Sequence, residues 1–183
     1  MNPSPNLFFI GPMGAGKTTI GRRTASVLDM PFHDLDQEIE ARTGASVNLV
    51  FDVEGECGFR ARETALLAEL AAGNGLVLAT GGGAVLHEEN RRVLRTRGFV
   101  VWLDVDPDAQ LSRLSRDRRR PLLSGPDRYQ RLQRLAAERN PLYAAIADLH
   151  VLSNGVGNCA QQARHVAELV ESRWQRSGAH MSA

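Results

Sequence analysis

Residues 11–18 read GPMGAGKT, which fits the spacing Gly-x-x-x-x-Gly-Lys-Thr of a phosphate-binding loop. Glycines in such a loop let successive backbone N–H groups point toward one anion, and the positive end of the following helix adds to that field. Lys17 then reaches the β- and γ-phosphates of a nucleoside triphosphate, and the Thr18 hydroxyl is placed for Mg²⁺. The stretch predicts a P-loop that binds Mg·ATP, through Gly11, Gly14, Ala15, Gly16, Lys17, Thr18 and Thr19.

The segments around this loop alternate between short apolar runs and helical patterns. Strands are expected at residues 7–10, 32–33, 76–80, 99–105 and 149–152. Helices are expected at residues 17–28, 36–42, 59–72, 90–97, 109–115, 128–147 (with a break near Pro141) and 159–174. This alternation favours βαβ units, so the predicted fold is α/β, a three-layer α/β/α P-loop NTPase fold with a mainly parallel five-stranded sheet. It is expected to be similar to nucleoside-monophosphate kinases.

We find no linker or repeat in the 183 residues, and residues 1–176 are predicted to form a single domain. Its core is expected at residues 7–28, 76–105 and 128–174, and the substrate-binding region at about 34–62. Residues 114–127 are charged and contain two prolines and a glycine, which predicts a mobile lid. Residues 177–183 are expected to be a disordered tail.

Composition excludes several classes of protein. The net charge of +1 lacks the basic excess of a nucleic-acid-binding face. No apolar stretch is long enough for a membrane helix, and the start MNPSPN has no basic region of a signal peptide. Cys57 and Cys159 are far apart and lack metal-site spacing, which indicates free thiols in a reducing compartment. We therefore expect a cytoplasmic monomer whose partners are small molecules.

A triphosphate site alone leaves the chemistry open. A GTPase would need an Asn-Lys-x-Asp motif, and Lys17 is the only lysine in the chain. A motor ATPase usually carries an acidic residue at the end of a second core strand, whereas residues 76–80 run into Gly81-Gly82-Gly83. A small-molecule kinase, which must hold an acceptor and exclude water, fits better. A nucleotide-binding regulatory module that has lost catalysis remains the alternative from another class.

Two aspartates follow the second predicted strand. With period-two geometry both carboxylates, of Asp34 and Asp36, face the same side, and in a P-loop fold that side lies near the phosphates. One carboxylate would serve Mg²⁺ and the other would hold an acceptor hydroxyl. The alternative is that Asp36 only caps the next helix.

Five motifs in chain order resemble the shikimate kinase family. They are HDLDQEIEARTG at residues 33–44, EGECGFRARE at 54–63, GGGAV at 81–85, RRRPLLSG at 118–125 and ERNPLY at 138–143. The resemblance covers residues 7–152 and implies transfer of the ATP γ-phosphoryl group to the 3-hydroxyl of shikimate. Gluconate-type and nucleoside-monophosphate kinases are the nearest enzymatic alternatives.

The resemblance also implies roles for individual residues. Asp34 helps position Mg²⁺, and Asp36 contacts the acceptor hydroxyls. Arg60 and Arg139 grip the substrate carboxylate, toward which Gly81, Gly82 and Gly83 present backbone N–H groups. Arg120 closes over the transferred phosphate as the lid arginine, and Arg113 lies near adenine. The expected catalytic residues are Lys17, Asp36 and Arg120.

The chemistry of these side chains agrees with that assignment. A small hydroxylated acid needs hydroxyl acceptors and a bidentate cation, which Asp36, Arg60 and Arg139 supply. An isolated arginine is more often a solvated surface charge, and Val47, Phe51 and Phe59 fit either an apolar wall of the site or plain core. The chain departs from the family after the last strand, where SNGVG at residues 153–157 replaces an expected Arg and Pro. How adenine is held is therefore left open.

Overall fold

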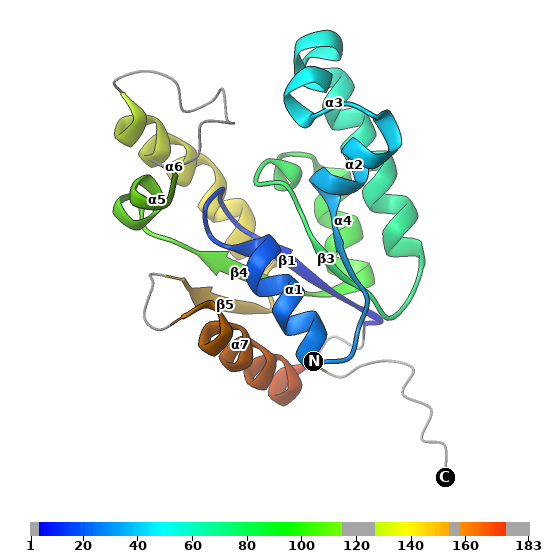
Figure 1. Cartoon of the computed structure of the whole chain (residues 1–183), viewed down its shortest axis with the longest axis vertical. Coiled ribbons are helices and arrows are strands. Elements are labelled where there is room, and N and C mark those ends of the chain that lie inside the picture. The colour runs from blue at the N-terminus through cyan, green and yellow to red at the C-terminus, as the bar shows by residue number, and fades with distance from the viewer. Residues whose placement is uncertain (1–3, 115–126, 154–157, 175–183) are drawn as a thin grey trace.

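The computed structural model describes residues 4–114, 127–153 and 158–174 (Figure 1). Its centre is a five-stranded sheet in the order β2-β3-β1-β4-β5. The strands are β1 (Asn6–Ile10), β2 (Phe32–Asp34), β3 (Val77–Ala79), β4 (Gly98–Asp104) and β5 (Leu149–Leu152). Every neighbouring pair is parallel, which confirms the predicted α/β class and the five-stranded sheet.

Seven α-helices of the described residues surround the sheet. They are α1 (Lys17–Val27), α2 (Leu35–Thr43), α3 (Val47–Ala72), α4 (Glu88–Arg97), α5 (Pro107–Leu114), α6 (Arg128–Ile146) and α7 (Cys159–Arg173), with a short 3₁₀ helix at Ala84–Leu86. Figure 1 shows α1 and α7 together over one face of the sheet, and α2, α3 and α4 on the other side.

The central strand explains why the sheet needs helices on both faces. All five residues of β1 are buried, as in parallel strands covered on two sides. Leu7 and Phe9 pack into the cluster formed with α1 and α7, whereas Phe8 and Ile10 pack into the opposite cluster. The single run NLFFI therefore anchors both hydrophobic layers.

The strand order also fixes where a ligand can bind. From β1 the chain crosses to β2 at one edge and returns to β3, while β4 and β5 extend the sheet on the other side of β1. Ligands of such sheets bind beyond the carboxyl ends of the strands where the direction changes. The P-loop follows β1, Asp34 ends β2, and Gly81 lies shortly after β3.

Helix α3 begins at Val47, well before the predicted start at residue 59. The Ser46 side chain caps it by accepting a hydrogen bond from the Leu49 N–H at 3.3 Å. Gly55 alone leaves the helical conformation, with φ 71° and ψ −179°, and divides α3 into two helical pieces. The two pieces are therefore joined by one glycine, and Gly58 remains helical.

The predicted break at Pro141 is also wrong, because α6 continues through it to Ile146. Proline removes one backbone hydrogen bond, but Tyr143 and Ile146 beyond it are buried in the core and hold the last turn in place.

Cys57 and Cys159 are exposed free thiols, as expected. Over the described ranges, none of the helices is both long and apolar enough to span a bilayer.

Candidate functional site

The P-loop joins the end of β1 to the start of α1. Gly14 and Gly16 have φ of 75° and 93°, left-handed values that favour glycine and turn the loop into a cradle. Gly16 is the N-cap of α1, and no side chain caps this helix end. The Lys17 ammonium donates hydrogen bonds to the carbonyls of Gly11 and Pro12, each at 2.8 Å. The Lys17 ammonium is thus held against the P-loop backbone by two carbonyl oxygens.

Thr18 and Asp34 meet beside this cradle. The Thr18 hydroxyl donates to Asp34 Oδ2 at 2.5 Å, although the two residues come from α1 and β2. Asp34 Oδ1 accepts the backbone N–H groups of Asp36 and Gln37 at 3.1 and 3.2 Å. Two hard oxygen atoms therefore lie together at the edge of the P-loop, which is the donor chemistry that Mg²⁺ prefers.

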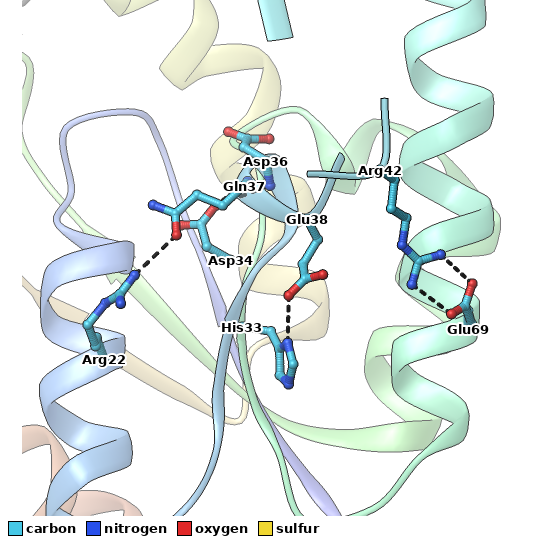
Figure 2. Close-up of polar contacts among 8 residues, drawn as sticks. All are labelled: Arg22, His33, Asp34, Asp36, Gln37, Glu38, Arg42 and Glu69. Carbon is cyan, nitrogen blue, oxygen red and sulfur yellow. Dashed lines mark hydrogen bonds and ion pairs between the residues drawn. The ribbon is translucent and has the colours of Figure 1, made fainter. Parts of the chain in front are cut away.

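The position of Asp36 differs from both sequence interpretations. Helix α2 begins at Leu35, so Asp36 lies in its first turn and not on a continuing strand. The residue that caps the helix is Asp34. The period-two reasoning is therefore wrong, and so is the alternative in which Asp36 is the cap. In Figure 2 the Asp36 carboxylate points away from that of Asp34.

Asp36 nevertheless reaches the loop after β3. A Cβ built on Gly81 would lie 3.0 Å from Asp36 Oδ1, so the carboxylate is against that glycine. Polar pairs hold both ends of α2 in place (Figure 2). They are His33 with Glu38 at 2.7 Å, Arg22 with Gln37 at 3.1 Å, and Arg42 bidentate with Glu69 at 2.6 and 2.7 Å.

Arg60 is buried on α3, contrary to the default of a solvated arginine. Its Nη1 donates to Glu63 Oε2 at 2.6 Å, one turn along the helix, and its Nε lies 3.5 Å from Glu56 Oε1. The guanidinium also lies over the rings of Phe51 and Phe59, 5.9 and 5.3 Å from their centres. These contacts fix the direction of the cation.

The apolar residues around Arg60 belong to the core cluster on this face of the sheet. Phe59 is buried, and Val47 and Phe51 are partly buried against the same cluster. Phe51 stacks on Phe59 with ring centres 4.2 Å apart. Phe59 is therefore a core residue, and Phe51 lies between it and the exposed side of α3.

We call residues 81–83 the glycine loop. It lies between the phosphate site and the acceptor side chains. A Cβ on Gly82 would lie 3.3 Å from the Met13 backbone nitrogen and 3.5 Å from the Gly11 carbonyl oxygen. On either side of Gly82, Gly81 faces Asp36 and Gly83 faces the Arg60 guanidinium. The loop brings the P-loop together with the residues expected to hold an acceptor.

Glu63 is a site residue that the sequence interpretation did not single out. It is completely buried, and burial raises the pKa of its carboxyl, a rise opposed by Arg60 and then by Arg139 and enhanced by Asp36. Its Oε1 has no hydrogen-bond partner in the described part of the chain and lies next to Gly81. The three-residue spacing from Arg60 on a helix is the sequence signal that could have identified this pair.

The remaining predicted residues are at the edges of the site. Arg113 donates to the Gly14 carbonyl at 2.9 Å and to the Ser153 carbonyl at 2.5 Å, which ties the P-loop to the end of β5. Arg139, on α6, is close enough to Glu63 to oppose the rise in the pKa of that carboxyl. Thr19 is exposed in the first turn of α1, and Ala15 is fully buried. Arg120, the predicted lid and the loop at 154–157 lie outside the described residues, apart from the lid's two end positions.

Comparison with known proteins agrees with this geometry. The family model described as shikimate kinase matches residues 13–171. A shikimate kinase from Stenotrophomonas maltophilia is 49% identical over 96% of this chain and 97% of its own length. One from Shewanella sediminis is 56% identical over 80% of this chain and 85% of its own length. The solved structure of a shikimate kinase from Acinetobacter baumannii in complex with shikimate superposes with a TM-score of 0.87 at 44% identity, covering 92% of this chain and 94% of that one. This chain belongs to the shikimate kinase family.

Proposed function

We propose that this enzyme transfers the γ-phosphoryl group of ATP to the 3-hydroxyl of shikimate at the site between the P-loop and the glycine loop. Family membership gives the reaction class, an ATP-dependent phosphorylation of shikimate. The observation that supports the site is the glycine loop itself. Gly82 packs on the P-loop, while Gly81 and Gly83 contact Asp36 and Arg60. A donor phosphate and an acceptor hydroxyl bound on its two sides would be neighbours.

On the donor side, the P-loop N–H groups and Lys17 would hold the β- and γ-phosphates. Thr18 and Asp34 would hold Mg²⁺, because their oxygens are adjacent at the edge of the cradle. When bound, the ion would neutralise charge on the phosphate oxygens. Arg113, which contacts both Gly14 and Ser153, would face the nucleotide from the opposite side.

On the acceptor side, Asp36 would orient the 3-hydroxyl and accept its proton as the oxygen attacks phosphorus. The new O–P bond forms as the bond between the γ-phosphorus and the bridging oxygen breaks, and ADP leaves. Arg60 and Arg139 would bind the carboxylate of the acid as charge-assisted donors. The Glu63 contact keeps the Arg60 guanidinium fixed before substrate arrives.

The experiment that tests the reaction measures ADP release with Mg·ATP and, separately, shikimate, gluconate, AMP or no acceptor. We expect turnover with shikimate alone. Turnover only with gluconate or AMP would overturn the substrate, and none with any acceptor would favour a regulatory nucleotide-binding module. Omission of Mg²⁺ in the presence of a chelator should abolish the activity.

The role of Asp36 is tested by Asp36→Asn. Loss of a general base typically costs about 10²- to 10⁴-fold in turnover, whereas nucleotide affinity should stay within a few fold. Asp52→Asn is the matched control, because Asp52 is an exposed aspartate on the first piece of α3. An equal loss of ATP binding in Asp36→Asn would show that Asp36 is structural.

The proposal also includes action as a monomer in the cytoplasm. Size-exclusion chromatography with light scattering would measure the mass against the 20.0 kDa of one chain. Cell fractionation with antibody detection would test the location.

A further inference from the structure

The side chain of Tyr143 joins two parts of the proposed carboxylate site. Its hydroxyl donates a hydrogen bond to the Gly82 carbonyl at 2.5 Å, which links α6 to the glycine loop. The Arg139 guanidinium, one helical turn earlier on α6, is near enough to this hydroxyl to act on it electrostatically. A neutral phenol has one proton to donate and lone pairs to accept. It can therefore donate its proton to Gly82 and keep its lone pairs for the nearby Arg139 cation.

The surroundings of Tyr143 keep its hydroxyl protonated. Tyr143 is completely buried, and its ring packs against Trp102 with ring centres 5.8 Å apart. Burial raises the pKa of the phenol far above its ordinary value, and the nearby Arg139 opposes this rise only in part. The hydroxyl thus keeps its proton over the working pH range, and the Gly82 bond persists.

We propose that Tyr143 is a positioning residue that sets the spacing between the Arg139 guanidinium and the glycine loop, so that the carboxylate site is formed before the acid binds. The inference rests on the proposed function and adds a residue to it. Gly82 lies between Gly81, which faces Asp36, and Gly83, which faces Arg60. A shift of the Gly82 carbonyl would therefore move Gly83 relative to the Arg60 guanidinium.

The test is Tyr143→Phe, which removes only the hydroxyl. The KM for shikimate should rise about tenfold, the loss expected for a hydrogen bond to a charged group. The KM for ATP and kcat should stay within about two- to threefold, because the P-loop and Asp36 are unchanged. Tyr129→Phe is the matched control. Tyr129 is the other tyrosine of the chain, lies on the same helix and is 37% exposed.

A neutral substrate separates positioning from a general structural defect. With the methyl ester of shikimate, which lacks the negative charge, Tyr143→Phe and the wild type should have the same KM. Equal increases of KM for the acid and the ester would overturn the inference, as would an unchanged KM for the acid in folded protein. A parallel rise in the KM for ATP would also overturn it.

A second measurement keeps Tyr143 in place and so does not depend on whether Tyr143→Phe folds. In Tyr129→Phe protein grown on 3-fluorotyrosine, the only fluorine signal comes from residue 143. This resonance should shift on titration with shikimate and not with gluconate. No shift at saturating shikimate would overturn the inference. Wild-type turnover of shikimate is measured first, because its absence refutes the proposed function, whereas normal turnover with neither effect refutes only the role of Tyr143.

Discussion

Gly83→Ala tests how tightly the Arg60 guanidinium is held. Gly83 has φ −97° and ψ −3°, so alanine strains no backbone there. Its Cβ, however, would lie 2.7 Å from Arg60 Cζ and 2.8 Å from Nη1, with Nη2 closer still. Arg60 is only 8% exposed, and its Nη1 is bound to the fully buried Glu63. To restore ordinary contacts the guanidinium must retreat by about 1 Å.

That displacement allows an estimate of the loss. A hydrogen bond to a charged group contributes about 1.5–3 kcal/mol. Loss of one such bond to the substrate carboxylate corresponds to about a 10- to 150-fold rise in the KM for shikimate. Overpacking should also lower the free energy of unfolding by about 1–3 kcal/mol. The KM for ATP should change by less than about twofold, because Arg60 binds no part of the nucleotide in this scheme.

Steady-state ADP release at varied shikimate and ATP, with urea unfolding of the same preparations, measures these quantities. Gly73→Ala is the control, because it follows the same helix α3 and its Cβ would approach no atom closer than 3.4 Å. A folded Gly83→Ala enzyme with wild-type KM for shikimate would refute the reasoning. Either the guanidinium moves freely, or it does not bind the carboxylate.

Three further predictions concern pH, backbone conformation and the sole lysine. Because burial raises the pKa of Glu63 above 4.5, its contribution to stability is greatest below that pH and is lost as pH rises through the raised pKa. In urea unfolding at a series of pH values, the free energy of unfolding of the wild type should therefore fall relative to that of Glu63→Gln as the pH rises through the raised pKa. A difference that stays constant or grows in the opposite direction would contradict the raised pKa of Glu63. Gly55→Ala should lower the free energy of unfolding by about 1–3 kcal/mol, because φ 71° and ψ −179° suit only glycine. A Cβ there meets nothing within 4 Å, so the cost comes from the backbone conformation alone. A cost under about 0.5 kcal/mol would show that the kink relaxes. Amine-reactive labelling of Lys17, read by peptide mass spectrometry, should slow with Mg·ATP and not with shikimate, and equal rates would remove Lys17 from the phosphate site.

The sequence predicted the parts of the site that depend on local spacing. GPMGAGKT needs only its own glycines and the strand and helix beside it to form an anion cradle. The structure places Gly16 at the N-cap of α1 and the Lys17 ammonium against the Gly11 and Pro12 carbonyls. The apolar runs predicted a parallel sheet because strands buried on both faces cannot tolerate polar residues. Side-chain type was also informative, because an aspartate that can accept a hydroxyl proton together with two arginines suits a hydroxylated acid and few other ligands.

Other features depended on contacts that the sequence does not display. Whether residue 35 continued a strand or began a helix was decided by the Asp34 carboxylate, which caps α2 and binds Thr18 from another element. The helix before Gly55 and the passage of α6 through Pro141 likewise depend on packing, which overrides local preference.

The sequence by itself therefore determined the fold class, the phosphate-binding loop and the candidate acceptor residues, because each follows from a short spacing or from burial on two faces. Only the tertiary structure decided that Gly81, Gly82 and Gly83 lie between the two halves of the site. It also decided that the Tyr143 hydroxyl reaches the Gly82 carbonyl and that the Arg60–Glu63 pair is buried beside the glycine loop. The contact between Tyr143 and Gly82 and the burial of Glu63 both require the helices to be packed on the sheet, which no local spacing displays.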